Sequence, residues 1–367
     1  MKIPFFNYPD LYLKNKDKLI DIFSDVGSRG AFIMQKDLEE FEHTIAEYTG
    51  SKYAIGVANA TDGLQIALMA GGLKEGSEVI ISSHTMIATA SAIHYAGAKP
   101  VPVEAGSDLM IDPSSLEEAI NNNTSAIMPT QLNGRTCDMD CIMSIADKYS
   151  LDVYEDAAQA LGSKFKNKAA GTFGIASAIS LYPAKLLGCL GDGGIVLTDE
   201  EEVYKKLRLL RDHGRDPDSG EVSSWGFNTR LDNMQAAFLN FFMSDYDDIV
   251  KRRRQIASLY NEGLSSIEQI TLPTPPNDGD HFDVFQNYEI QAHRRDDLKS
   301  YMSEKGIGSL VQWSGKAVHQ FDQLKFSVQL PKTDELFLKI LMIPLNMSIT
   351  DEEVEYVIET IKEFYKG

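Results

Sequence analysis

From Tyr53 to Thr198 the sequence alternates short apolar runs with longer amphipathic runs, and this alternation limits the possible fold more than any other feature. The short runs are rich in Val, Ile and Ala, which is typical of buried strands, and the longer runs have helical spacing. Strands that alternate with helices form a mostly parallel sheet with right-handed crossovers. Ligands bind such sheets at the carboxyl ends of the strands. We therefore expect an α/β fold with its site along that edge. The expected strands are 53–58, 79–82, 99–103, 125–129, 151–155, 176–182 and 194–198.

The length of the chain, 367 residues, favours two domains over one. Residues 10–48 have helical spacing around a glycine-containing break but no core of their own, so this N-terminal arm should pack on the large domain or on a second subunit. A charged helix around residues 245–259 leads to shorter alternating and helical stretches from about residue 270. We expect a large domain over residues 1–245, including the arm, and a smaller C-terminal α/β domain over residues 246–367.

Charge and cysteine content narrow the class of protein. A formal net charge of -19 argues against nucleic acid or an anionic membrane as the main partner, because both bind clustered Lys and Arg. It does not exclude a small anion such as phosphate, which a few backbone N–H groups can hold. Cys137, Cys141 and Cys189 lack metal-ligand spacing, so we expect free thiols and no metal site. The sequence has no signal-like apolar core and no long apolar run, which predicts a cytoplasmic protein.

Lys185 is the first candidate functional residue. It lies between the apolar run 176–182 and a loop that contains four glycines. A lysine buried there without a partner would cost several kcal/mol or lose its proton, and a neutral amine is what Schiff-base formation with an aldehyde requires. The alternative is a surface lysine in a turn.

A possible phosphate site follows the strand 53–58. Asn59 or Thr61 can cap the next helix, which leaves the first N–H groups of that helix pointing past the strand end, where a phosphate fits. The alternative is a plain capped helix. Because Thr61, Asp156, Ser180 and Lys185 all fall at or just beyond strand ends, one pocket could hold all four.

The chain resembles, over nearly its whole length, the DegT/DnrJ/EryC1/StrS family of pyridoxal-phosphate-dependent sugar aminotransferases. Several ordered stretches match the family's motifs at the family's spacing: 59–64, 83–89, 138–140, 155–163, 180–194 and 226–237. The resemblance implies the type I aminotransferase fold, with a large domain built on a mixed, mostly parallel sheet flanked by helices and a smaller C-terminal α/β domain.

The resemblance also implies the two catalytic residues. Lys185 would carry pyridoxal phosphate as a Schiff base and, once displaced by the amino donor, would move the proton. Asp156 would face the pyridine nitrogen and keep it protonated, which makes the ring an electron sink when the α-proton leaves.

Further cofactor contacts are implied in the same way. The phosphate would lie on the backbone of Ala60 and Thr61 and on the Ser180 hydroxyl, with Gln159 near the ring. Asn228 would reach in from the other subunit of a homodimer, so that the active sites are shared between subunits. Met86 stands where the family usually has a stacking aromatic, so either its thioether contacts the ring or Met86 is ordinary helix core.

The sequence departs from the family around 130–135 and 311–319, and we expect those segments to select the substrate. The candidate residues in these segments are Gln131, Asn133, Arg135, Gln312, Trp313, Lys316 and His319. Arg230, in the matching stretch 226–237, is a further candidate for contact with the substrate. Some of them could be purely structural, and a lone histidine such as His319 is more often a satisfied polar residue than a catalyst.

The intact Lys185 implies transamination, because the dehydrating branch of the family has histidine there. The donor would be glutamate and the acceptor a nucleotide-linked keto sugar. The sequence Gly-Asp-Gly-Gly at 191–194 resembles members that act on 3-keto sugars, whereas many 4-keto members have Gly-Glu-Gly-Gly. We expect amination at C3 of a dTDP-linked 3-keto-6-deoxyhexose for polysaccharide or glycan biosynthesis. The alternatives are a 4-keto-sugar aminotransferase, a non-catalytic regulator that binds pyridoxal phosphate, and a purely structural α/β protein.

Overall fold

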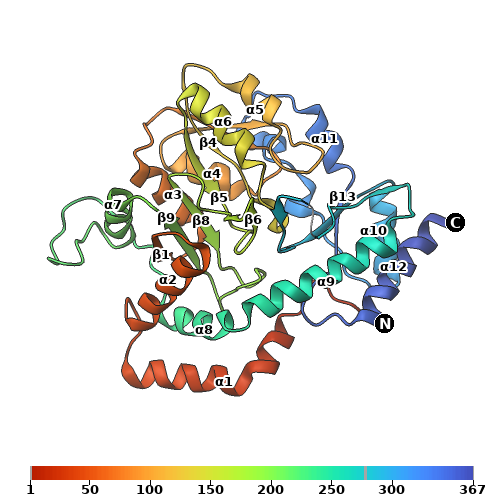
Figure 1. Cartoon of the computed structure of the whole chain (residues 1–367), viewed down its shortest axis with the longest axis horizontal. Coiled ribbons are helices and arrows are strands. Elements are labelled where there is room, and N and C mark those ends of the chain that lie inside the picture. Colours follow the sequence, from red (N-terminus) through yellow and green to blue (C-terminus); the bar gives the residue numbers. More distant parts are fainter. Residues whose placement is uncertain (1, 277–278, 367) are drawn as a thin grey trace.

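The computed structural model describes residues 2–276 and 279–366 and places a large sheet with its helices beside a smaller lobe (Figure 1). The helices of this part of the chain are α1 (Tyr8–Arg29), α2 (Lys36–Thr49), α3 (Ala60–Gly71), α4 (Ile87–Tyr95), α5 (Pro113–Ala119), α6 (Met139–Tyr149), α7 (Glu201–Arg211), α8 (Asn233–Met243), α9 (Tyr246–Leu264), α10 (Arg295–Glu304), α11 (Pro331–Phe337) and α12 (Asp351–Lys366). The strands are β1 (Tyr53–Val57), β2 (Glu78–Ser82), β3 (Lys99–Val103), β4 (Thr124–Met128), β5 (Asp152–Asp156), β6 (Lys164–Phe165), β7 (Lys168–Ala169), β8 (Ala176–Ser180), β9 (Gly194–Thr198), β10 (Ile270–Thr271), β11 (His281–Phe282), β12 (Tyr288–Ala292) and β13 (Ile340–Ile343).

The large sheet is mixed. Among the described residues its strand order is β1-β9-β8-β5-β4-β2-β3, and β9 runs antiparallel to both of its neighbours while the other pairs are parallel. The reason is the connection. No helix crosses from β8 to β9; residues 181–193 form a loop that turns back directly, which produces an antiparallel pair. Lys185 lies in this loop.

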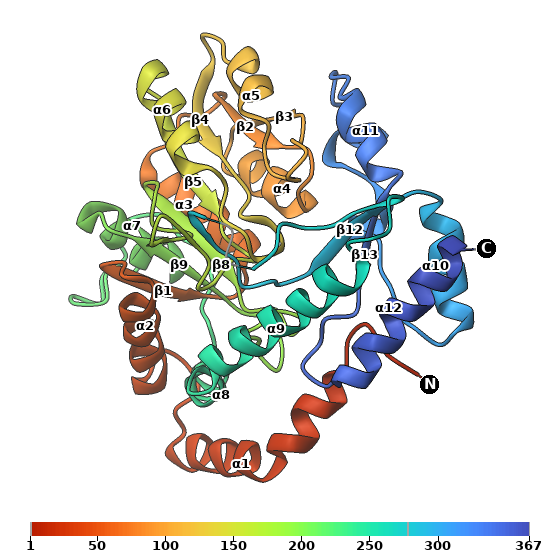
Figure 2. The same cartoon turned by 45° about the vertical axis from the view of Figure 1, so that its right-hand side comes forward.

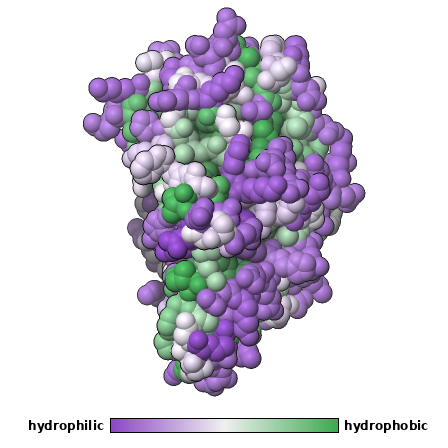
Figure 3. Space-filling view, turned by 90° about the vertical axis from the view of Figure 1, so that its left-hand side faces the viewer, coloured by the Kyte–Doolittle hydropathy of each residue, from purple (hydrophilic) through white to green (hydrophobic). Residues whose placement is uncertain are grey.

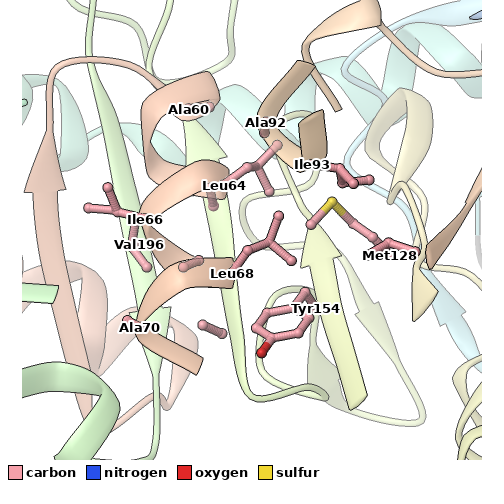
Figure 4. Close-up of a cluster of buried hydrophobic side chains, with 14 of the residues drawn as sticks. Ala60, Leu64, Ile66, Leu68, Ala70, Ala92, Ile93, Met128, Tyr154 and Val196 are labelled. Atoms are coloured by element: carbon pink, nitrogen blue, oxygen red, sulfur yellow. The ribbon is translucent and has the colours of Figure 1, made fainter. Parts of the chain in front are cut away.

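The strands of the large sheet are apolar on both faces, as expected for a sheet covered by helices. Along β9, Val196 packs in the cluster that α3 covers, whereas Ile195 and Leu197 pack in the cluster on the opposite face. Leu64 and Leu68 of α3 point toward Met128 and Tyr154 (Figure 4). Full burial of each such leucine side chain stabilises the folded protein by about 1.5–3 kcal/mol. This packing fixes where α3 begins, and the candidate site depends on that position.

The smaller lobe contains the sheet β10-β12-β13, packed against α9, α10 and α12. Figure 2 shows α9 running between the two lobes. The first described residues join this lobe: Ile3 pairs with Ile307 and is buried in its core, and Asn7 donates a hydrogen bond to Ser348. β11 pairs instead with β6.

The sequence-based elements lie close to the observed ones. Strands 99–103 and 194–198 have the expected bounds, and the expected strand 176–182 ends two residues early, at Ser180. The arm folds as α1 and α2, with the break at Gly30 in the left-handed conformation (φ 63°). The sequence did not predict α5, α11, β13 or the hairpin β6–β7, because these short elements lack a periodic pattern of useful length. No helix of the described residues is both long enough and apolar enough to span a membrane.

Candidate active site

A cavity of about 600 Å³ lies at the carboxyl ends of β1, β5 and β8. Ten of the residues singled out in the sequence line it. They are Asn59, Ala60, Thr61, Met86, Asp156, Gln159, Ser180, Lys185, Gln312 and Trp313. The edge of the sheet where ligands were expected therefore carries a cavity that collects residues from distant parts of the chain.

Asp156 is the last residue of β5 and is 4% exposed. Its carboxylate accepts hydrogen bonds from the Thr89 hydroxyl (2.6 Å) and the Ala158 N–H (3.1 Å). Thr130 donates to Thr85, and Thr85 lies 2.7 Å from Thr89, so a row of three buried threonines leads to the carboxylate and fixes its orientation. Burial raises the pKa of Asp156, while the bonds from Thr89 and Ala158 and the charge of Lys185 oppose that rise.

Lys185 is half-buried and lines the same cavity. Its backbone N–H donates to Tyr182 O (2.8 Å), which closes a turn just after β8. Burial lowers the pKa of the Lys185 amine to about 8, and the charge of Asp156 limits the decrease. A substantial fraction of this amine is therefore neutral near pH 8, the form that attacks an aldehyde. The alternative of an ordinary surface lysine does not fit this position.

The start of α3 forms another wall of the cavity. The Asn59 side chain accepts a hydrogen bond from the Asp62 N–H (2.9 Å) and caps the helix, while Ala60 and Thr61 occupy its first turn, where N–H groups have no partner within the helix. Gly194 passes against this start so closely that a Cβ there would lie 2.6 Å from Asn59 C and 2.7 Å from Ala60 N. A glycine is required here because backbone approaches backbone.

Gln159 belongs to a polar network that continues beyond the cavity. It accepts hydrogen bonds from the Asn133 N–H (2.8 Å) and from Asn287 (3.4 Å). The Asn133 amide donates to Glu289 (2.8 Å) and accepts from Gln312 (2.7 Å) and Asn287 (2.9 Å). Asn133 has a positive φ of 56°, which asparagine tolerates better than most residues. The network thus ties the ring-side residue expected in the sequence to the smaller lobe.

These groups fit pyridoxal phosphate. A capped helix start with unpartnered N–H groups and a glycine-only contact suits a phosphate, a buried carboxylate suits a protonated ring nitrogen, and a lysine with a lowered pKa suits an aldehyde. The Ser180 hydroxyl, which accepts from the Tyr182 N–H (3.3 Å), stands on the same wall.

Met86 is 52% exposed and directly precedes α4. Because it lines the cavity, the alternative of ordinary helix core is wrong. Trp313 has a positive φ of 48° and packs edge-on against His84, with ring centroids 5.1 Å apart.

Other sequence candidates lie outside the lining of this cavity. His319 contacts Ser83 (2.7 Å) and Asp334 (3.0 Å), which is the structural role considered for it. Lys316 and Asn228 are exposed, and the half-buried Arg230 pairs with Asp212 (2.8 Å).

Gln131 and Arg135 make structural contacts. The Gln131 amide donates to the buried Glu155 (2.7 Å) and accepts from the Cys137 N–H (2.7 Å). Arg135 pairs with Asp283 (2.6 Å) beside a separate, smaller cavity. The three cysteines are free, as expected.

Several residues of the site were not identified as candidates from the sequence. Thr85, Thr130, Gln286 and Asn287 line the cavity, and Thr89 orients Asp156. The matching stretch 83–89 contains two of these threonines. Gln286 and Asn287 had no sequence signal, since they lie about 100 residues beyond Lys185 in the chain.

Comparison with known proteins agrees with this geometry. A model of the DegT/DnrJ/EryC1/StrS aminotransferase family matches residues 14–362. The chain is 35% identical to the pleiotropic regulatory protein of Geobacillus stearothermophilus, over 100% of this chain and 99% of that protein. It is 35% identical to the dTDP-3-amino-3,6-dideoxy-alpha-D-galactopyranose transaminase of Aneurinibacillus thermoaerophilus, over 99% of each chain. The crystal structure of S. venezuelae DesV, in complex with a ketimine intermediate, superimposes with a TM-score of 0.95 at 33% identity and covers 100% of this chain and 99% of that chain.

These matches confirm the resemblance seen in the sequence and the expected fold, with its mixed, mostly parallel sheet and smaller C-terminal α/β domain.

Proposed function

Because this chain belongs to the DegT/DnrJ/EryC1/StrS aminotransferase family, whose members depend on pyridoxal phosphate, we propose that it transfers an amino group from glutamate to C3 of a nucleotide-linked keto sugar. The observation that carries the proposal is the meeting of Lys185, Asp156 and the start of α3 in one cavity. The cavity, about 600 Å³, has room for a cofactor and part of a sugar.

The roles of the residues follow from their surroundings. When bound, the cofactor draws electrons from the carbon that loses its proton. Asp156, held by Thr89, keeps a positive charge on the ring nitrogen. Lys185 would attach the cofactor through its amine and, once released, would carry the proton from the donor carbon that loses it to the cofactor's aldehyde carbon, which its pKa of about 8 allows near neutral pH. Ala60, Thr61 and Ser180, which line the cavity, would hold the phosphate.

Two observations support a dTDP-linked 3-keto-6-deoxyhexose as the acceptor, for polysaccharide or glycan synthesis. The Aneurinibacillus relative is named for a 3-amino-3,6-dideoxy sugar on dTDP, and Asp192 of the 191–194 motif lines the cavity. Gln312 and Trp313 stand on the wall from the smaller lobe, where they would contact the sugar. Amination of a 4-keto sugar is the alternative.

A homodimer would complete the site. Asn228 is exposed and does not line its own chain's cavity, which leaves it available to a second subunit. Apolar side chains are exposed nearby and on the arm, among them Trp225 (96%), Leu13 and Phe23. Apolar areas interrupt the polar surface on the side of the molecule seen in Figure 3. We propose that Arg230 lies beside Asn228 in the partner's site and that the exposed Lys316 lies at the rim, whereas His319 has a structural role through Ser83 and Asp334.

We propose that the two domains divide between residues 245 and 246, where α9 starts at Tyr246. We also propose a cytoplasmic location, which the three free thiols favour.

A regulatory role is the second candidate function, because the Geobacillus relative is named a pleiotropic regulatory protein. One assay separates the two. The purified protein, loaded with pyridoxal phosphate, is incubated with glutamate and either a dTDP-linked 3-keto or a dTDP-linked 4-keto 6-deoxyhexose. Our proposal predicts 2-oxoglutarate and an amino sugar in equal amounts with the 3-keto substrate. Turnover with the 4-keto sugar alone would move the amine to C4, and cofactor binding without any amino sugar would favour the regulator.

A further inference from the structure

Gln286 of the smaller lobe holds the loop that carries Lys185. The Gln286 side chain is buried, and its amide makes two hydrogen bonds across the cavity wall. Oε1 accepts from the Leu186 N–H (3.0 Å), and Nε2 donates to Ala184 O (2.9 Å). These two groups stand on either side of Lys185. Because one partner can only donate and the other can only accept, the orientation of the amide is determined.

The backbone of Gln286 is itself fixed. The buried guanidinium of Arg253, on α9, donates to Phe285 O (2.7 Å) and to Gln286 O (2.7 Å). Phe285 has a positive φ of 53°, an unfavourable conformation for a side chain of this size. The backbone of Gln286 also packs closely against Gly134: a Cβ added to Gly134 would lie 2.5 Å from the backbone N of Gln286. The side chain therefore acts from a rigid support.

The loop that receives these bonds has no regular structure of its own. Residues 181–193 contain three glycines, and between β8 and β9 they are held mainly by the turn at Tyr182, by the bond from Cys189 N–H to Leu181 O, and by side chains from outside. Next to Lys185 itself, the backbone bonds are the turn to Tyr182 and the two bonds from Gln286.

We propose that Gln286 is a positioning residue for Lys185: by bonding the peptide groups on both sides of the lysine, it fixes where the amine meets the cofactor's aldehyde. This inference rests on the proposed function, because it assigns Gln286 a role toward the same reaction. It also means that the smaller lobe takes part in holding the lysine.

The test compares Gln286→Met with Gln235→Met. Gln235 is a matched control, because its amide bonds the same loop through the N–H (2.8 Å) and O (3.3 Å) of Leu190, five residues after Lys185. The measurement is the rate at which apoprotein forms an imine with added pyridoxal phosphate, followed by absorbance from pH 6.5 to 10. Thermal unfolding of each apoprotein shows that the variants fold.

In Gln286→Met the loop is less constrained and the Lys185 amine is more exposed to water, so the pKa of this amine should rise. The pH midpoint of imine formation should therefore move up, and imine formation at pH 7.5 should slow by about fivefold or more. The largest slowing expected is about 200-fold, which is the ratio at pH 7.5 between the neutral fraction of an amine with a pKa of 8 and that of an ordinary lysine. Gln286→Glu keeps the bond from Leu186 and adds a negative charge, so its midpoint should also rise. Gln235→Met should keep the wild-type midpoint.

Two results would overturn the positioning role: a wild-type midpoint and rate in both Gln286 variants, or the same change in Gln235→Met as in Gln286→Met. If the wild type itself forms no imine, the proposed function fails before the role of Gln286 is at issue.

Discussion

Gly194→Ala should damage the start of α3, where we propose that the cofactor's phosphate binds. The added Cβ would lie 2.6 Å from Asn59 C and 2.7 Å from Ala60 N, whereas ordinary contacts begin near 3.4 Å. Both neighbours are backbone atoms at the start of α3, and the packing of that helix on the sheet prevents them from rotating away. The helix start must therefore move by roughly 0.7 Å, which for overpacking of this kind costs about 1–3 kcal/mol.

Gly191→Ala is the matched control from the same motif. A Cβ there would meet only the end of the Gln235 side chain, at 3.2 Å, and that amide can shift. We therefore expect little change in either the unfolding temperature or cofactor affinity for Gly191→Ala.

The assay has two parts: thermal unfolding of the apoproteins, and titration with pyridoxal phosphate followed by absorbance. Gly194→Ala should unfold several degrees below the wild type and bind the cofactor at least about tenfold more weakly, because the N–H groups of Ala60 and Thr61 no longer meet the phosphate. Equal behaviour of the two alanine variants would refute the steric argument.

Three further changes test the charges around the cavity. Asp156→Asn should fold and still attach the cofactor at Lys185, but its amino-transfer activity should fall by about a hundredfold or more. The pH midpoint at which the apoprotein forms an imine should also move below 8, because the variant lacks a charge that raises the pKa of Lys185; an unchanged midpoint would contradict this. Thr89→Val should cost about 1–2 kcal/mol of unfolding free energy and weaken cofactor binding, with recovery in Thr89→Ser, since only serine restores the bond to Asp156; equal behaviour of valine and serine would argue against the hydroxyl's role. Burial raises the pKa of Glu289 to about 7, so the stability that its protonation contributes is complete below the ordinary glutamate pKa and is lost as the pH rises through 7. The unfolding free energy of the wild-type apoprotein should therefore fall between pH 5 and 8, and Glu289→Gln should abolish up to about 3 kcal/mol of that fall. An identical pH dependence in both proteins would refute this.

The sequence predicted the parts of the fold whose residues carry periodic signals. The strands of the large sheet and the long helices followed from apolar spacing, and the position of Lys185 after a buried strand was sufficient to identify it as a candidate. The direction of β9 was not predicted by the alternation alone, because the connection 181–193 contains no helix and therefore reverses the chain.

Residues brought together only by tertiary structure could not be predicted. The bonds of Gln286 join residues about 100 positions apart, and the network of Asn133, Asn287 and Glu289 spans more than 150. Nothing in the local sequence around 286 distinguishes a side chain that holds a catalytic loop from one that faces water.

Some candidates chosen by sequence motif were placed elsewhere by the structure. Gln131 is close to the site in sequence, but its amide bonds Glu155 and Cys137 behind the cavity wall. Asn228 and Arg230 do not line their own chain's cavity, and only an assembly with a second subunit would bring them to a site. A single sequence does not reveal which residues act across an interface.

The central claim is that Lys185 carries the cofactor and releases it to an amino donor. The direct measurement is borohydride reduction of the protein loaded with pyridoxal phosphate, before and after glutamate is added, followed by peptide mass mapping. The account predicts one pyridoxyl phosphate group per chain on Lys185 before glutamate, and loss of that label once glutamate has converted the cofactor to its amine form. A label on another lysine, no label at all, or a label on Lys185 that glutamate leaves unchanged would contradict it.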